Sequence, residues 1–155
     1  MASAETQPVM TGGCQCGAVR YALMSEPTLA SICHCRMCQK AFGNYFSALT
    51  GVPREDLVWT KGELGVFRSS EAVERGFCRD CGTPLTYSYL EHDRISVSIG
   101  SLDHPDRIKP EIQYGVESRL PAFETLHTLP GIVTEDDNPP EELAKMKSRQ
   151  HPDHD

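Results

Sequence analysis

The sequence predicts an all-β fold of short antiparallel strands organised around clusters of cysteine. Three observations support this class. Apolar and polar residues alternate over short runs, which is the period of a half-buried strand. Glycine and proline separate these runs at short intervals, as they do in all-β domains. No segment of ten or more residues repeats its apolar side chains with the period of a helix.

The elements follow in order along the chain. Backbone order is expected to begin at Gly12–Gly13, where a tight turn brings amides close to the first cysteines. Val19–Leu23 alternates as a strand with Val19, Tyr21 and Leu23 on one face. A single helical turn is expected after Cys35. Further strands are predicted at residues 46–50, 57–59, 66–69, 85–89, 94–99 and 112–116.

The chain of 155 residues, 39% of them hydrophobic, has the size of one domain with a modest core. We expect a flexible leader over residues 1–11, a metal-binding domain over residues 12–134 and an acidic tail over residues 135–155. The tail holds seven acidic and three basic side chains and few apolar ones. Burial there is too small to offset the ordering entropy, so a mobile or only partly docked tail is predicted, with a short helix over residues 141–147.

Charge and hydropathy exclude several classes of protein. The net charge is -7, and no basic patch is present that would follow a phosphate backbone, so nucleic acid is not an expected partner. No run approaches the ~20 apolar residues of a membrane span. The first residues lack the basic start and apolar run of a secretory signal. A cytoplasmic, reducing location is therefore expected.

All seven cysteines lie in short clusters: Cys14 and Cys16; Cys33, Cys35 and Cys38; Cys78 and Cys81. The alternative to metal binding is a set of disulfides. Cysteines two or three residues apart are too close for a typical framework bridge, and an odd total leaves one thiol unpaired. In a reducing compartment, clustered thiols indicate metal more often than disulfides. A redox role for Cys78-x-x-Cys81 is disfavoured because no βαβ pattern surrounds it.

The count divides into four and three. Two short loops, each followed by glycine, can converge on one zinc ion as a closed structural site. These loops are Cys14-x-Cys16-Gly17 and Cys78-x-x-Cys81-Gly82. The sequence leaves open a different pairing, in which the middle cluster shares ligands with Cys78 and Cys81.

The middle cluster has three thiols within six residues, Cys33, Cys35 and Cys38, which leaves a fourth coordination position. In one interpretation His34 or a remote residue closes the site. In the other, solvent or substrate takes the fourth position, and zinc there would deprotonate a bound thiol. His34 lies between two ligands, so its side chain should tend to point away from the ion. Arg36 and Lys40 flank this loop and are candidates to contact an anionic thiol substrate, although surface charges are an equally good explanation.

These clusters and their neighbours resemble the glutathione-dependent formaldehyde-activating enzyme family, also called the centromere protein V-like family, which has an Mss4-like β fold. The matching stretches are Gly12–Tyr21, Cys33–Lys40, Arg75–Leu85, Ile99–Asp103 and Glu117–Pro121. The chain departs from relatives of this kind at Ala122, where an aromatic residue is common.

The resemblance implies two zinc ions per chain. Cys14, Cys16, Cys78 and Cys81 would hold the structural ion, and Cys33, Cys35 and Cys38 the ion of the active site. The implied activity is that of a carbon–sulfur lyase, written in the reverse direction as the combination of glutathione and formaldehyde into S-(hydroxymethyl)glutathione. The implied partner is a small thiol such as glutathione. The alternative is a non-catalytic zinc-binding interaction module, a role that the Mss4-like fold also serves.

Overall fold

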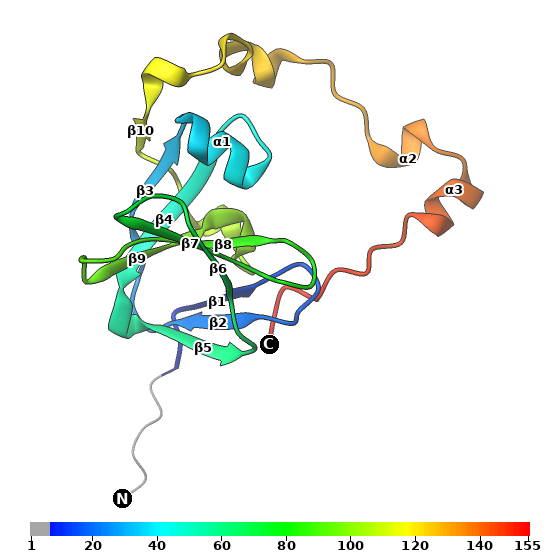
Figure 1. The fold of residues 1–155 in the computed structure, drawn as a ribbon. Coiled ribbons are helices and arrows are strands. Elements are labelled where there is room, and N and C mark those ends of the chain that lie inside the picture. Colours follow the sequence, from blue (N-terminus) through cyan, green and yellow to red (C-terminus); the bar gives the residue numbers. More distant parts are fainter. Residues whose placement is uncertain (1–6) are drawn as a thin grey trace, which may run out of the picture.

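The computed structural model describes residues 7–155, and within this range ten strands form two sheets (Figure 1). The smaller sheet has the order β1 (Met10–Gly13), β2 (Arg20–Leu23) and β5 (Leu57–Lys61). The larger sheet has the order β10 (Ile112–Tyr114), β3 (Thr28–Cys33), β4 (Ser47–Pro53), β9 (Arg94–Ser98), β8 (Pro84–Tyr89), β7 (Val73–Phe77) and β6 (Gly65–Arg68). Neighbouring strands are antiparallel except β10 and β3, which are parallel. The predicted all-β class is confirmed.

Helices are few and short. They are α1 (Arg36–Phe42), α2 (Thr134–Asp137) and α3 (Pro140–Lys145), with 3-10 turns at residues 54–56, 99–101, 105–107, 116–118 and 121–128. α1 extends the single helical turn predicted after Cys35 to seven residues and ends at Gly43, which adopts φ 55°. None of the helices in residues 7–155 has the length and apolar character that crossing a membrane requires.

Side chains from both sheets form one apolar core. Its fully buried members include Tyr21 and Leu23 of β2, Val52 of β4, Leu85 of β8 and Val97 of β9. Burying side chains of this size stabilises a fold by about 1.5–3 kcal/mol each. Tyr21 and Leu23 lie in the core as predicted, but Arg20 and Ala22 are buried as well, so this strand is covered on both faces and is not half-buried.

The ordered sheet begins slightly earlier than the sequence predicts. Met10 is buried and pairs with Leu23, so β1 starts two residues before the expected start of the domain at residue 12. The physical reason is that Met10 and Val9 add apolar surface to the core, which outweighs the ordering of two more residues. The part of the predicted leader in residues 1–6 lies outside the described residues.

The segment after β10 runs away from the domain and then returns (Figure 1). No residue from 119 to 155 is buried, and α2 and α3 lie on this outer path. Residues 151–155 end beside β1 and β2. The mobility expected for residues 135–155 stays a prediction, while the contacts of the last five residues show where the segment docks.

Candidate metal centres and the adjoining cavity

The first candidate centre, the four-cysteine cluster, joins the two sheets. Cys14 and Cys16 lie between β1 and β2, and Cys78 and Cys81 lie between β7 and β8. All four Sγ atoms lie within 4.8 Å of one another. The Sγ atoms of Cys14 and Cys16 are 3.6 Å apart, and those of Cys16 and Cys78 are 3.8 Å apart. Four thiolates around one zinc ion at Zn–S of ~2.3 Å have S···S edges of about 3.8 Å, so the donor set fits a tetrahedral metal.

Each loop of this cluster turns at a glycine with a positive φ angle. Gly17 and Gly82 adopt φ values of 76° and 77°, in the left-handed region that glycine enters without steric cost. The Gly17 N–H donates to the Cys14 carbonyl at 3.1 Å, and the Gly82 N–H donates to the Cys78 carbonyl at 2.9 Å. The glycine after each cysteine pair therefore turns the backbone so that both sulfurs point to one centre.

Thr83 connects the two loops and was not anticipated from the sequence. Its hydroxyl accepts a hydrogen bond from the Gln15 N–H at 3.0 Å and lies 3.1 Å from the Cys81 Sγ. Burial would raise the pKa of Cys81, but hydrogen bonds from Thr83 and Cys16 lower it to about 6. A thiol with a lowered pKa is more readily present as the thiolate, which is the form that binds a metal ion.

The second candidate centre, the three-cysteine cluster, lies where β3 meets α1. Cys33 ends β3, Cys35 caps α1, and Cys38 lies in its first turn. The Cys38 N–H donates to the Cys35 Sγ at 3.4 Å, so the helix start itself orients two of the sulfurs. The three Sγ atoms lie within 4.8 Å of one another.

The electrostatic interactions among the three thiols of this cluster also favour a bound cation. Burial, and next the charge of Cys38, raise the pKa of Cys33 to about 12. Burial acts in the same direction on Cys38, but the Ser47 hydroxyl and the Arg75 guanidinium turn its net pKa shift downward. Three thiolates this close repel one another, and a bound metal ion removes that conflict. The donor set of this cluster therefore also fits a metal ion.

His34 points away from the cluster, as the sequence led us to expect. Its side chain is fully buried, and its Nε2 lies 2.8 Å from the Gln113 Oε1. Its ring packs edge-on against Phe123, with centroids 4.6 Å apart, and against Phe46. Among the described residues, the metal-ligand group of this site contains the three cysteines alone. The fourth coordination position is therefore free of protein ligands there.

Arg75 is a candidate site residue that the sequence did not indicate. It lies in the middle of β7, only 8% exposed, and its Nη2 donates to the Cys38 Sγ at 3.5 Å. The Nε donates to the Ser69 hydroxyl at 3.2 Å, and the guanidinium lies over the ring of Tyr87 at 4.9 Å. Within residues 7–155, the buried Nη1 has no hydrogen-bond partner. A buried cation with an unused donor is a functional-site signal.

A cavity of about 450 Å³ opens over the three-cysteine cluster. This volume lies in the range of small-molecule sites, about 300–1,000 Å³. Its wall is largely aliphatic and aromatic, with serine hydroxyls and one cation. The lining residues are Leu29, Ser31, Cys33, Cys35, Met37, Cys38, Leu49, Ser69, Val73, Arg75, Tyr87, Tyr89, Ser96 and Tyr114.

Arg36 and Lys40 lie elsewhere. Both side chains are exposed, and Arg36 Nη1 donates to the Gln39 Oε1 at 3.2 Å. They border a separate hollow with Tyr45 and Leu120, and neither lines the cavity over the three sulfurs. A substrate contact by these two residues stays a prediction, and the structure offers Arg75 as the cation nearest the cluster.

The fold and the two clusters together define a small β protein with one group of four and one group of three cysteines that could each hold a metal ion. The model of the glutathione-dependent formaldehyde-activating enzyme family matches residues 9–118. The chain belongs to this family, which confirms the resemblance inferred from the cysteine motifs.

Two similar proteins agree with this assignment. A Schizosaccharomyces pombe protein, named as an uncharacterized lyase, is 35% identical over 83 residues, which is 53% of this chain and 59% of the relative. The match thus spans less than two thirds of that relative's length. A crystal structure of a Rhodobacter sphaeroides protein superposes with a TM-score of 0.53 and 23% identity, covering 68% of this chain and 99% of that one. This likeness concerns the fold.

Proposed function

We propose that this protein is a zinc-dependent carbon–sulfur lyase that acts on the adduct of a small thiol and an aldehyde, as S-(hydroxymethyl)glutathione synthase does. The observation that carries the proposal is the cavity whose wall contains three cysteine sulfurs with no fourth protein ligand among the described residues. Family membership and the lyase name of the yeast relative support the reaction class.

Zinc bound by Cys33, Cys35 and Cys38 would supply Lewis acidity and would favour the thiolate form of a bound thiol. The reaction adds a thiol S–H across a carbonyl group. A carbon–sulfur bond forms, and the carbonyl oxygen gains a proton to become a hydroxyl. The reverse reaction breaks the same bond and returns the thiol and the aldehyde.

Arg75 is the group of this chain best placed to hold the substrate beside the sulfurs. Its guanidinium is fixed by Ser69, Cys38 and the face of Tyr87, so little side-chain entropy is lost when a ligand binds. Arg75 lines the cavity, so its positive charge suits a carboxylate of the thiol or the oxygen of the carbonyl group. The field of a buried cation is stronger than that of an exposed one because less water screens it.

Tyr87 offers a hydroxyl on the same wall. Burial first, and then Tyr89, raise its pKa above the ordinary range of tyrosine. The hydroxyl therefore stays protonated at neutral pH and can donate a hydrogen bond. The aliphatic side chains of Leu49, Val73 and Met37 line the same cavity and reduce access of bulk water to the reacting groups.

The non-catalytic alternative expects a closed middle site without a neighbouring anion-binding group. The open cavity and the buried Arg75 favour the enzyme. The decisive measurement is the rate of exchange between glutathione, formaldehyde and their adduct, followed by NMR exchange spectroscopy with the zinc-loaded protein. We expect acceleration over the protein-free rate that is lost in Cys35→Ser. Protein loaded with two zinc ions that accelerates no thiol–aldehyde pair would support the interaction module instead.

The role of Arg75 is tested with Arg75→Gln beside Arg68→Gln, an exposed arginine on the neighbouring strand β6. Loss of one charge-assisted hydrogen bond corresponds to about 1.5–3 kcal/mol, or roughly 10–100-fold in rate. We expect this loss for Arg75→Gln at unchanged zinc content, and no loss for Arg68→Gln. Equal rates for the two variants would remove Arg75 from the site.

A further inference from the structure

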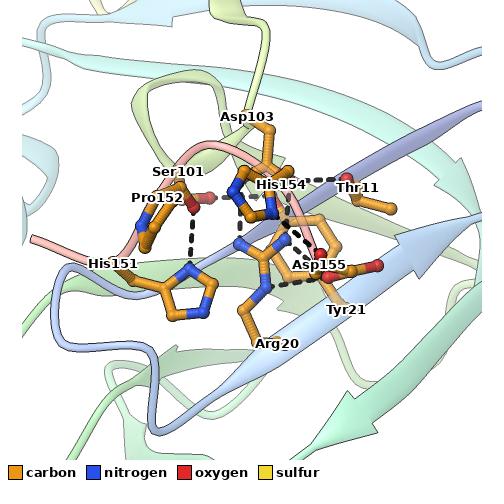
Figure 2. Close-up of polar contacts among 9 residues, drawn as sticks. All are labelled: Thr11, Arg20, Tyr21, Ser101, Asp103, His151, Pro152, His154 and Asp155. Atoms are coloured by element: carbon orange, nitrogen blue, oxygen red, sulfur yellow. Dashed lines mark hydrogen bonds and ion pairs between the residues drawn. The ribbon is translucent and has the colours of Figure 1, made fainter.

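A hollow beside the four-cysteine cluster, separate from the cavity over the three-cysteine cluster, is lined by Arg20 of β2. This arginine is 5% exposed and contacts two carboxylates from distant parts of the chain. Figure 2 shows its guanidinium between Asp103 and Asp155. The first carboxylate belongs to the core, and the second belongs to the segment that returns from the outer loop.

Each carboxylate uses a different edge of the guanidinium. Nη1 and Nη2 donate to Asp103 at 2.9 and 2.6 Å, and the Thr11 hydroxyl donates to the same aspartate. Nε and Nη2 donate to the Asp155 Oδ1 at 3.0 and 2.6 Å. The pair with Asp103 is complete without the second carboxylate. Among the described residues, Asp155 is the only acceptor for Nε. The outer edge of the guanidinium, formed by Nε and Nη2, is therefore available to another ligand when Asp155 is displaced.

The contact between Asp155 and Arg20 is the first recognition point. The second is the loop Cys14–Gly17. The His151 N–H donates to the Gln15 carbonyl at 2.8 Å. The imidazole of His151 covers Gly17 so closely that an added Cβ there would lie 2.2 Å from its Cδ2. A hollow of about 260 Å³ runs between these two points, and its wall includes Cys14, Arg20 and Asp103. Residues 150, 151 and 153 already form part of that wall.

Residues 151–155 make few contacts with the domain, and the segment that precedes them adds little. Residues 119–150 have no buried side chain, so little besides the two recognition points holds residues 151–155 in place. With the mobility predicted for this tail, residues 151–155 compete for the site at an effective concentration on the order of millimolar. Such a segment can leave the site and be replaced by another of the same chemistry.

We propose that Arg20 and the loop Cys14–Gly17 form a binding site for short acidic peptide segments, and that residues 151–155 occupy it in this chain. The carboxylate contacts the outer edge of Arg20, and a backbone N–H four residues earlier contacts the Gln15 carbonyl. The site is separate from the cavity of the three-cysteine cluster and does not depend on the proposed enzymatic function.

The test uses the full chain with the substitution Asp155→Asn, because a change at buried Arg20 would also break its pair with Asp103 and disturb folding. The probe is a synthetic peptide of residues 150–155, acetylated and amidated so that only side-chain carboxylates remain. Its matched control carries asparagine in place of Asp155. Binding is measured by calorimetry at low salt, and the Arg20 Nε–H resonance is followed by NMR.

We expect the Asp155→Asn chain to bind the peptide at least about tenfold more tightly than the unchanged chain, whose own segment competes at millimolar effective concentration. Binding should shift the Arg20 Nε–H resonance, and the control peptide should bind about tenfold more weakly. The substitution Asp137→Asn, in the exposed helix α2, should leave peptide binding like that of the unchanged chain. Equal affinity for the two peptides, or no binding up to millimolar peptide, would overturn the proposal.

Discussion

The two cysteine centres should respond differently to the same chemical change. Replacing Cys81 by serine should destabilise the whole domain, and replacing Cys35 by serine should affect the fold much less. The reason is the length of chain that each metal would cross-link. The four-cysteine cluster joins residues 62 apart in sequence, such as Cys16 and Cys78, from two different sheets. The three-cysteine cluster spans only residues 33–38, from the end of β3 to the first turn of α1.

The difference can be expressed in free energy of unfolding. By the loop-closure relation, a cross-link over a loop of about 60 residues contributes about 4 kcal/mol, and one over about five residues contributes about 2 kcal/mol. Unfolding free energies of domains are typically about 5–15 kcal/mol. At about 2–4 °C per kcal/mol for a chain of this size, Cys81→Ser should lower Tm by about 8–16 °C and Cys35→Ser by about 4–8 °C.

The assay is a thermal melt of both variants and the parent, each with its zinc content measured by elemental analysis. The two substitutions are matched, since both replace a partly exposed ligand thiol by a hydroxyl. Cys35→Ser should also lose thiol binding, because two thiolates do not complete the site. An unfolded Cys35→Ser beside a normally melting Cys81→Ser would reverse the structural and catalytic assignments.

Three further predictions follow from the same contacts. Freshly purified protein should contain close to two zinc ions per chain. A chelator should release the ion of the three-cysteine cluster first. A single ion per chain, or disulfides found in a thiol titration, would contradict this prediction. Burial would raise the pKa of Asp103, but hydrogen bonds from Arg20 and Thr11 lower it. The ion pair therefore stabilises the fold above about pH 4, the ordinary aspartate range, and this stability is lost as pH falls through the lower folded pKa. Asp103→Asn should lower Tm at neutral pH and flatten its dependence on pH between about 2 and 4; a parallel acid profile in variant and parent would count against the pair. Deleting residues 138–155 should change Tm by less than about 3 °C, since no side chain there is buried; a larger fall would show that the segment stabilises the core.

The sequence predicted the elements whose signal is local. The strands predicted at residues 57–59 and 94–99 are present as Leu57–Lys61 and Arg94–Ser98. The pairing of the cysteines into four and three also followed from spacing and coordination chemistry. Gly17 and Gly82 adopt positive φ because the turn after each cysteine pair requires it. These features depend on neighbours within a few residues, so a single sequence contains the information.

The missed features depend on contacts made across the fold. β3 (Thr28–Cys33) lacks clean alternation, and its register shifts after Thr28, beside Leu29, which adopts φ 57°. β7 (Val73–Phe77) contains Glu74, Arg75 and Gly76, a composition that does not indicate a strand. Arg75 is buried because Cys38 and Tyr87 come from other elements to surround it. No pattern along the chain distinguishes such an arginine from a surface one.

The β7–β8 hairpin connects the two candidate centres physically. Its turn holds Cys78 and Cys81, and its strands carry Arg75 and Tyr87 as direct register partners on the cavity wall. Metal at the turn would therefore fix the hairpin to β1 and β2, and so fix the distance from Arg75 to Cys38. Activity should consequently depend on both cysteine clusters, but for different reasons. Under the proposed function, loss of the three-cysteine cluster would remove the reacting centre from an intact fold. Loss of the four-cysteine cluster would instead displace the cavity wall that carries Arg75 and Tyr87.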